Sequence, residues 1–146
     1  MSKTILVPVD GSRHSKKALE FACEYASKFD ASIHLVHVAQ PLHNDKTLVL
    51  GAAAVTVHAS REELESAGKQ VIDAAVEVAS EHGCEGVTSE IDGGDPAQVI
   101  VRTAKSKNAD MIVMGTRGLS NLSELLVGSV SNKVTHLSPC TVVTVR

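Results

Sequence analysis

Short apolar segments alternate with longer helical patterns along the whole chain, and this alternation constrains the fold more than any other feature. Five segments predict strands, at residues 4–9, 32–38, 87–91, 110–114 and 141–145. Helical spacing of apolar residues, with Asp95 as an N-cap, predicts helices over 13–29, 60–82, the stretch after Asp95 and 128–137. Such alternation predicts an α/β fold with a parallel sheet and helices on both faces, joined by right-handed crossovers. We therefore expect one domain over residues 1–146, with a single doubly wound five-stranded sheet in strand order 3-2-1-4-5.

All three aromatic residues of the chain lie in the predicted helix 13–29. Phe21, Tyr25 and Phe29 recur at helical spacing together with Ala18, Ala22 and Ala26. A stripe with this spacing is typical of a helix face that packs on a core. We expect the aromatic side chains to pack there rather than to bind a ligand.

Residues 39–59 form an unusually long connection between the second predicted strand and the following helix. Connections of this length are usually functional or mobile. We expect some short structure in the apolar middle of this segment, acting as a lid or as a contact between subunits.

The composition argues against nucleic acid and membranes as partners. The net charge is −3 and no cluster of Lys and Arg occurs, whereas nucleic-acid binding needs a basic surface. The longest apolar stretch, residues 48–57, is interrupted by Gly51 and Thr56 and is too short to span a bilayer. The N-terminal apolar run is too short for a signal peptide.

Cysteine and histidine patterns do not predict a metal site or a disulfide framework. Cys23, Cys84 and Cys140 are odd in number, far apart in sequence and without a CxxC pair. Free thiols fit a reducing compartment, so we expect a cytoplasmic protein. His34 and His37 are three residues apart on a predicted strand, so they face opposite sides of the sheet and cannot hold one ion.

A glycine cluster follows the fourth predicted strand. Gly115, Gly118 and Gly128 lie where the predicted strand order reverses between strands 1 and 4, the place where this type of fold binds ligands. One interpretation is turn geometry followed by a serine cap. The other is a phosphate site, in which the first amides of the last helix, the hydroxyls of Ser129 and Ser131, and Arg117 contact phosphate oxygens. The spacing alone does not choose between them.

The cluster lacks the groups that fast phosphoryl transfer requires. No GxxxxGK[ST] or GxGxxG pattern occurs, and Lys133 lies five residues beyond Gly128. We therefore assign no catalytic residue, and expect at most weak ATP hydrolysis.

Three stretches make the chain resemble the universal stress protein family. They are "ILVPVDGS", "GDPAQVIVRTAKSKNADMIVMGTRG" and "GSVSNKVTHLSPCTVVTVR", and together with the segments between them they leave only residues 39–59 unconstrained. The family pattern G-x2-G-x9-G-[ST] is met by Gly115, Gly118, Gly128 and Ser129. The resemblance implies ATP binding, the 3-2-1-4-5 sheet and a homodimer formed through the last strand. Thr141 departs from the proline that many members have after this cysteine, which puts the dimer edge rather than the nucleotide site in doubt.

The resemblance also implies a set of nucleotide-binding residues. Pro8, Val9 and Asp10 would line the adenosine side, with Asp10 near the ribose or base, and the backbone of Val38 would meet adenine. Asp10 has a second interpretation as the N-cap of the first helix. The residues expected to hold ribose and phosphates are Met114, Gly115, Arg117, Gly118, Gly128, Ser129, Val130 and Ser131.

These features favour a nucleotide-dependent stress-response regulator or adaptor that binds ATP, with Mg²⁺ or Mn²⁺ accompanying the phosphates, and acts on an unknown protein partner. A slow ATP hydrolase, with Asp10 holding a divalent ion, is one alternative. The others are a dimeric adaptor that needs no nucleotide and a protein whose ligand is cyclic AMP.

Overall fold

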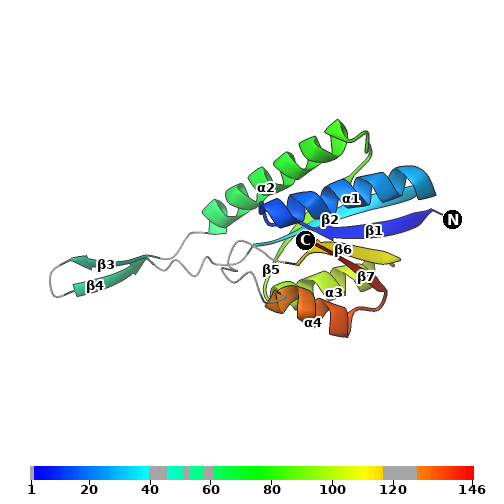
Figure 1. The fold of residues 1–146 in the computed structure, drawn as a ribbon. Helices are drawn as coiled ribbons and strands as arrows, with labels where there is room; N and C mark the ends of the chain where they lie inside the picture. Colours follow the sequence, from blue (N-terminus) through cyan, green and yellow to red (C-terminus); the bar gives the residue numbers. More distant parts are fainter. Residues whose placement is uncertain (1, 40–45, 51–52, 58–60, 117–127) are drawn as a thin grey trace.

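Five parallel strands form the central sheet of the computed structural model, which describes residues 2–39, 46–50, 53–57, 61–116 and 128–146 (Figure 1). In chain order they are β1 (Lys3–Pro8), β2 (Ala31–Ala39), β5 (Thr88–Gly93), β6 (Met111–Gly115) and β7 (Thr141–Val145). Their order across the sheet is β5-β2-β1-β6-β7, and each neighbouring pair is parallel. The predicted order 3-2-1-4-5 is confirmed.

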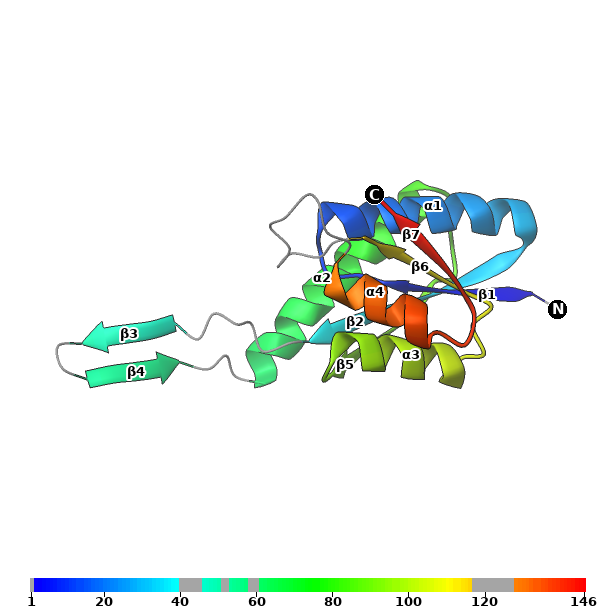
Figure 2. The ribbon, with the colours of Figure 1, turned by 60° about the horizontal axis from the view of Figure 1, so that its bottom comes forward.

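Four helices cover the two faces of this sheet. Helices α1 (Arg13–Phe29) and α2 (Arg61–Glu81) pack on one face, and α3 (Pro96–Ser106) and α4 (Ser129–Leu137) on the other (Figures 1 and 2). The helices change from one face to the other after β5. There the chain passes from β5, at one side of the sheet, to β6, which pairs with β1 in the middle. The predicted N-cap of α3 is confirmed, since Asp95 Oδ2 accepts a hydrogen bond from Gln98 N at 3.1 Å and Pro96 begins the helix.

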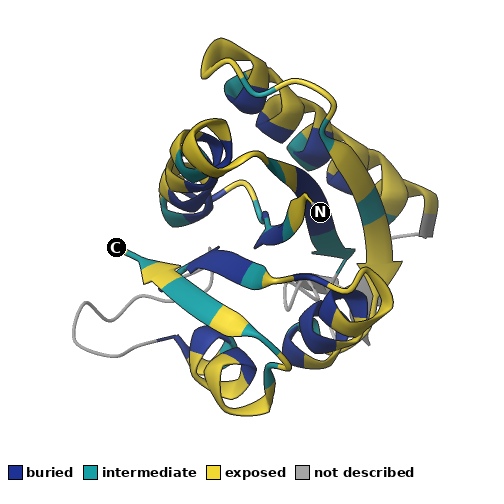
Figure 3. Ribbon diagram, turned by 90° about the vertical axis from the view of Figure 1, so that its right-hand side faces the viewer, coloured by how far each residue is buried: buried dark blue, intermediate teal, exposed yellow. Residues whose placement is uncertain are grey.

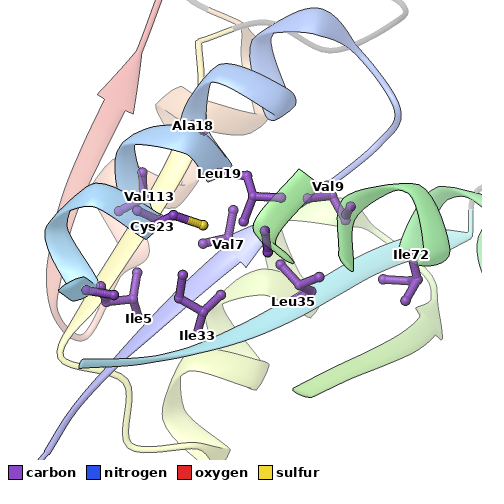
Figure 4. Close-up of a cluster of buried hydrophobic side chains, with 14 residues drawn as sticks. Ile5, Val7, Val9, Ala18, Leu19, Cys23, Ile33, Leu35, Ile72 and Val113 are labelled. Atoms are coloured by element: carbon purple, nitrogen blue, oxygen red, sulfur yellow. The ribbon is translucent and has the colours of Figure 1, made fainter. Parts of the chain in front are cut away.

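Alternate residues of the buried strands supply two separate hydrophobic cores. Ile5 and Val7 of β1 face α1 and α2, where they pack with Leu19 and Leu35 (Figure 4). Leu6, on the opposite side of the same strand, packs with Ile100 and other residues beneath α3 and α4. Burial on both faces explains why the strands are continuous apolar runs rather than alternating ones.

Two of the three aromatic residues of α1 do not face the core, contrary to the sequence prediction, whereas Tyr25 packs against it as predicted. Phe21 is 42% exposed and Phe29 is 56% exposed, and the ring of Tyr25 is half-buried 4.5 Å from that of Phe29. The buried face of α1 is formed by Ser15, Ala18, Leu19, Ala22, Cys23 and Ala26. The alanines of the predicted stripe are thus buried, while the aromatic rings lie along one flank of the helix, because a helix face covers only part of the circumference.

A β-hairpin occupies the middle of the long connection after β2. Strands β3 (Lys46–Leu50) and β4 (Ala53–Val57) pair antiparallel with each other. The expectation of short structure in this segment is confirmed, and Figures 1 and 2 show the hairpin apart from the five-stranded sheet.

The two histidines of β2 lie on opposite faces of the sheet, as predicted. His34 is buried on the side of α3, with Nδ1 2.6 Å from Thr88 Oγ1 and Nε2 3.5 Å from Glu90 Oε2. Burial lowers the pKa of His34 below its ordinary value, although the neighbouring Glu90 opposes the shift. His37 lies on the side of α2, and its Nδ1 is 2.8 Å from Val9 O. Both residues therefore connect neighbouring strands.

Candidate functional site

A tight turn joins the carboxyl end of β1 to α1. Asp10 Oδ1 accepts a hydrogen bond from Ser12 N at 2.9 Å, and Ser12 Oγ accepts one from Ser15 N at 3.2 Å. The N-cap of α1 is therefore Ser12, and the interpretation of Asp10 as the cap is wrong. Gly11 has a φ of +82°, a conformation that favours glycine and lets the chain turn between these two residues. Among the described residues Asp10 Oδ2 has no hydrogen-bond partner, so this oxygen remains available to a ligand.

Gly115 ends β6 in direct contact with the first turn of α1. A Cβ atom added to Gly115 would lie 2.8 Å from both the C and the Cβ of His14, and 3.0 Å from His14 O. This close approach is a reason for the glycine that neither interpretation of the glycine cluster included. The contact also brings the N-terminus of α1 next to the end of β6.

Thr116 connects the end of β6 to the start of α4. Its N donates to Val145 O at 3.0 Å, and its O accepts from Gly128 N at 2.8 Å. Gly128 is the N-cap of α4 and offers no side chain for capping. The amides of the next residues, Ser129 and Val130, begin the helix and have no partner within it, as at any helix start.

The hydroxyl of Ser131 is directed into the protein. Ser131 is buried, and its Oγ donates to Gly128 O at 2.9 Å and to Thr116 O at 3.3 Å. The hydroxyl therefore stabilises the start of α4 in this structure, whereas Ser129, two residues earlier, is exposed.

Most of the predicted site residues lie at one edge of the sheet, the one formed by the carboxyl ends of its strands. Pro8 ends β1 and is followed by Val9 and Asp10, Met114 and Gly115 end β6, and these two strands are neighbours. Val9 N donates to Val36 O at 2.9 Å, and Val38, two residues further along β2, lies near the end of that strand at the same edge. The hydrogen bond between Thr116 and Gly128 brings Gly128, Ser129, Val130 and Ser131 to this edge as well. Arg117 and Gly118 lie outside the described residues.

Two residues at this edge, His37 and His14, were not predicted from the sequence, and a third, Thr116, was expected only as part of the segment 114–118. His37 is close to Val9 O, and Thr116 joins β6 to α4. His14 has a buried Nδ1 that lacks a hydrogen-bond partner in the part of the chain that the structure describes. Their roles depend on the fold and no motif marks them, although Thr116 lies within the glycine segment itself.

A small cavity lies next to this edge, between α1 and α2. It has a volume of about 110 Å³ and is lined by Val9, Ser12, Ser15 and Lys16 together with apolar residues of α2. Sites for small-molecule ligands usually have volumes of about 300–1,000 Å³. We therefore do not assign this cavity to a nucleotide.

Among the described ranges, no group of three or more His, Cys, Asp or Glu residues is arranged to hold a metal ion. Within those ranges, too, no helix is both long and apolar enough to cross a membrane.

Comparison with known proteins identifies the family to which the chain belongs. The model of the universal stress protein family matches residues 1–146. The chain belongs to the universal stress protein family. A universal stress protein of Bacillus subtilis, YxiE, is 36% identical over 149 aligned positions that cover all of both chains.

Solved structures of universal stress proteins share the fold. The universal stress protein UspA from Lactobacillus plantarum superposes with a TM-score of 0.77 at 24% identity, over 99% of this chain and 97% of the other. A universal stress protein crystallised in complex with cAMP superposes with a TM-score of 0.73 at 26% identity, over 99% of this chain and 97% of the other. The arrangement of strands and helices described above is thus that of the family.

Proposed function

We propose that residues 1–146 form a single ATP-binding domain that acts as a nucleotide-dependent regulator or adaptor in a stress response. The observation that carries the proposal is the meeting of the β1 turn, the end of β6 and the start of α4 at one edge of the sheet. In doubly wound folds this edge, at the point where the strand order reverses, is the usual ligand site. The solved relative in complex with cAMP supports an adenine nucleotide as the ligand.

The start of α4 suits the phosphates. Ser129 and Val130 present backbone amides that the helix does not use, and the partial positive charge of a helix N-terminus favours anions. Gly128 adds no side chain between these amides and a ligand. In this proposal Arg117 and Gly118 complete the phosphate contacts from the preceding loop.

The β1 turn suits the nucleoside. Asp10 keeps one carboxylate oxygen without a protein partner in the described ranges, which fits a hydrogen bond from a ribose hydroxyl or from the base. The buried and unpartnered Nδ1 of His14 is a second polar atom next to Gly115 that a ligand can satisfy. Pro8, Val9 and Val38 supply aliphatic surface and backbone for adenine, and a divalent cation would accompany the phosphates.

The nucleotide can be identified directly. We expect the protein, purified without added nucleotide and then denatured, to release an adenine nucleotide, which anion-exchange chromatography compares with ATP, ADP, AMP and cyclic AMP standards. ATP or ADP supports the proposal, whereas cyclic AMP makes that nucleotide the ligand, as in the solved relative. A protein that releases no nucleotide and binds none in a titration contradicts the proposal and leaves a nucleotide-free adaptor.

We propose further that the chain forms a homodimer through β7. This strand has β6 as its neighbour on one side only, and Figure 3 shows it at the open edge of the sheet. The two helices that contact β7 carry exposed apolar residues, Phe21 and Phe29 on α1 and Leu137, 57% exposed, at the end of α4. Open strand edges and exposed apolar patches both favour pairing with another chain.

A proline at position 144 tests the dimer. Val145 O points toward β6 and accepts a hydrogen bond from Thr116 N. Successive residues of a strand direct their backbone N–H and C=O groups to opposite sides, so the N–H of Thr144 points toward the open side of β7. In sedimentation experiments we expect the parent protein and Thr144→Val to be dimers and Thr144→Pro to be a monomer. Proline removes the backbone N–H that would pair with the second chain, and leaves the hydrogen bonds between β7 and β6 in place. A parent protein that sediments as a monomer, or a Thr144→Pro variant that remains dimeric, contradicts pairing through this edge.

A further inference from the structure

Two cysteines that are far apart in the sequence meet between α1 and the turn after α2. Cys23 lies in the middle of α1 and is 1% exposed within the core of that face (Figure 4). Cys84 is half-buried and packs against the same cluster of buried side chains, close enough to Cys23 for the two thiols to influence each other. Both thiols are free in the structure.

We propose that Cys23 and Cys84 are a site of reversible oxidation, at which a peroxide converts the two thiols into an intramolecular disulfide. Cys23 is the buried thiol of this pair, and Cys84 is the more accessible one. This arrangement is typical of redox-sensitive sites, in which an accessible cysteine reacts first and a neighbouring cysteine resolves the product.

The backbone around Cys84 allows the short movement that bond formation requires. Cys84 lies outside any helix or strand, in the turn between α2 and β5. Gly83 and Gly86 on either side have φ angles of +74° and +72°, and a Cβ added to either would meet no atom within 4 Å. There is therefore open space beside both glycines. One end of the turn is held in place, because Cys84 N donates to Ala79 O at 2.8 Å and His82 Nε2 lies 3.5 Å from Glu20 Oε2 of α1.

The accessible thiol reacts first. Burial among apolar side chains raises the pKa of Cys23 to about 12, with further contributions from Cys84 and Glu20, so Cys23 stays protonated at neutral pH. The peroxide reaches Cys84 first, because Cys84 is half-buried whereas Cys23 is 1% exposed, so the first attack on the peroxide falls to Cys84. Its sulfur attacks one peroxide oxygen, the O–O bond breaks, hydroxide leaves, and Cys84 becomes a sulfenic acid.

The buried thiol then completes the disulfide. The sulfur of Cys23 attacks the sulfur of the Cys84 sulfenic acid, the S–O bond breaks, and the departing hydroxide takes the Cys23 proton to form water. In sum, two thiols lose two electrons and two protons, and the peroxide is reduced to two molecules of water. An external dithiol reverses the reaction by thiol–disulfide exchange.

The experiment treats the reduced full-length protein with hydrogen peroxide, blocks the remaining thiols with an alkylating agent, and measures intact mass and tryptic peptides. We expect the number of free thiols to fall from the three in the sequence to one, with a mass loss of about 2 Da before alkylation. The disulfide joins the tryptic peptide of residues 18–28 to that of residues 70–102, and dithiothreitol separates them.

Matched variants distinguish this site from general oxidation. Cys84→Ala and Cys140→Ala both replace half-buried cysteines, and we expect only Cys84→Ala to prevent the cross-link. Cys23→Ala also prevents it, and circular dichroism before oxidation shows whether each variant is folded. The proposal is overturned if the oxidised parent protein keeps Cys23 free while Cys84 carries a sulfinic acid, or if the cross-link contains Cys140.

Discussion

Replacing Ser129 with glutamate is expected to lower the affinity for ATP by about tenfold to a hundredfold, or about 1.4–2.7 kcal/mol, without lowering the Tm. Ser129 is the first residue of α4 and is exposed. A carboxylate at this position complements the helix dipole and stabilises an isolated helix start by about 0.3–1 kcal/mol. The same carboxylate repels the phosphates that we place at these amides. Stability and binding therefore change in opposite directions, which a purely structural role of this segment does not predict.

Gln98→Glu provides the matched control for this substitution. Gln98 is an exposed residue in the first turn of α3, and its replacement adds the same charge at another helix start. Isothermal titration with ATP and thermal unfolding of both variants give the two readouts. Equal losses of affinity in the two variants would indicate a general effect of net charge. An unchanged affinity in Ser129→Glu would place the phosphates away from α4.

The sheet could be predicted from the sequence because strands buried on both faces are continuous apolar runs. Residues 4–9 and 110–114 have this pattern, and they became the adjacent strands β1 and β6. The faces of α1 were harder to predict. Alanine and large aromatic residues share the helical spacing, and only the contact with the sheet decided that Ala18 and Ala22 are buried while Phe29 is exposed.

The meeting of the strand ends at the candidate site could also be predicted, but the contacts between them could not. The reversal of strand order places the carboxyl ends of β1 and β6 together whatever their side chains are. The approach of His14 to Gly115 and the bond from Gly128 N to Thr116 O depend on how α1 and α4 pack on the sheet. Local sequence patterns describe periodicity and turns, and contain no information on such distances. The contact of Cys23 with Cys84 was missed for the same reason.

The contact between Gly115 and α1 leads to the largest expected effect on stability. We expect Gly115→Ala to lower the free energy of unfolding by about 2–3 kcal/mol and the Tm by roughly 5–10 °C. The new Cβ would lie 2.8 Å from the C and Cβ atoms of His14, and real Cβ atoms essentially never approach this closely. Backbone atoms of a helix start cannot move aside as the end of a flexible side chain can. The strain would fall on the turn in which Ser12 caps α1, or on the pairing of Gly115 with Val145.

Gly93→Ala isolates this steric cost from the general effect of removing a glycine. Gly93 is the last residue of β5, as Gly115 is of β6, and neither has a positive φ. A Cβ at Gly93 has Ala39 O, at 3.8 Å, as its nearest neighbour, which is an ordinary contact. Both substitutions restrict the unfolded chain equally, an effect that alone stabilises a protein by about 0.4–1 kcal/mol. Urea unfolding should therefore show Gly93→Ala at or above the stability of the parent protein and Gly115→Ala well below it. Equal stability of the two variants would mean that α1 moves away from β6 at little cost, and that Gly115 is not required by the fold.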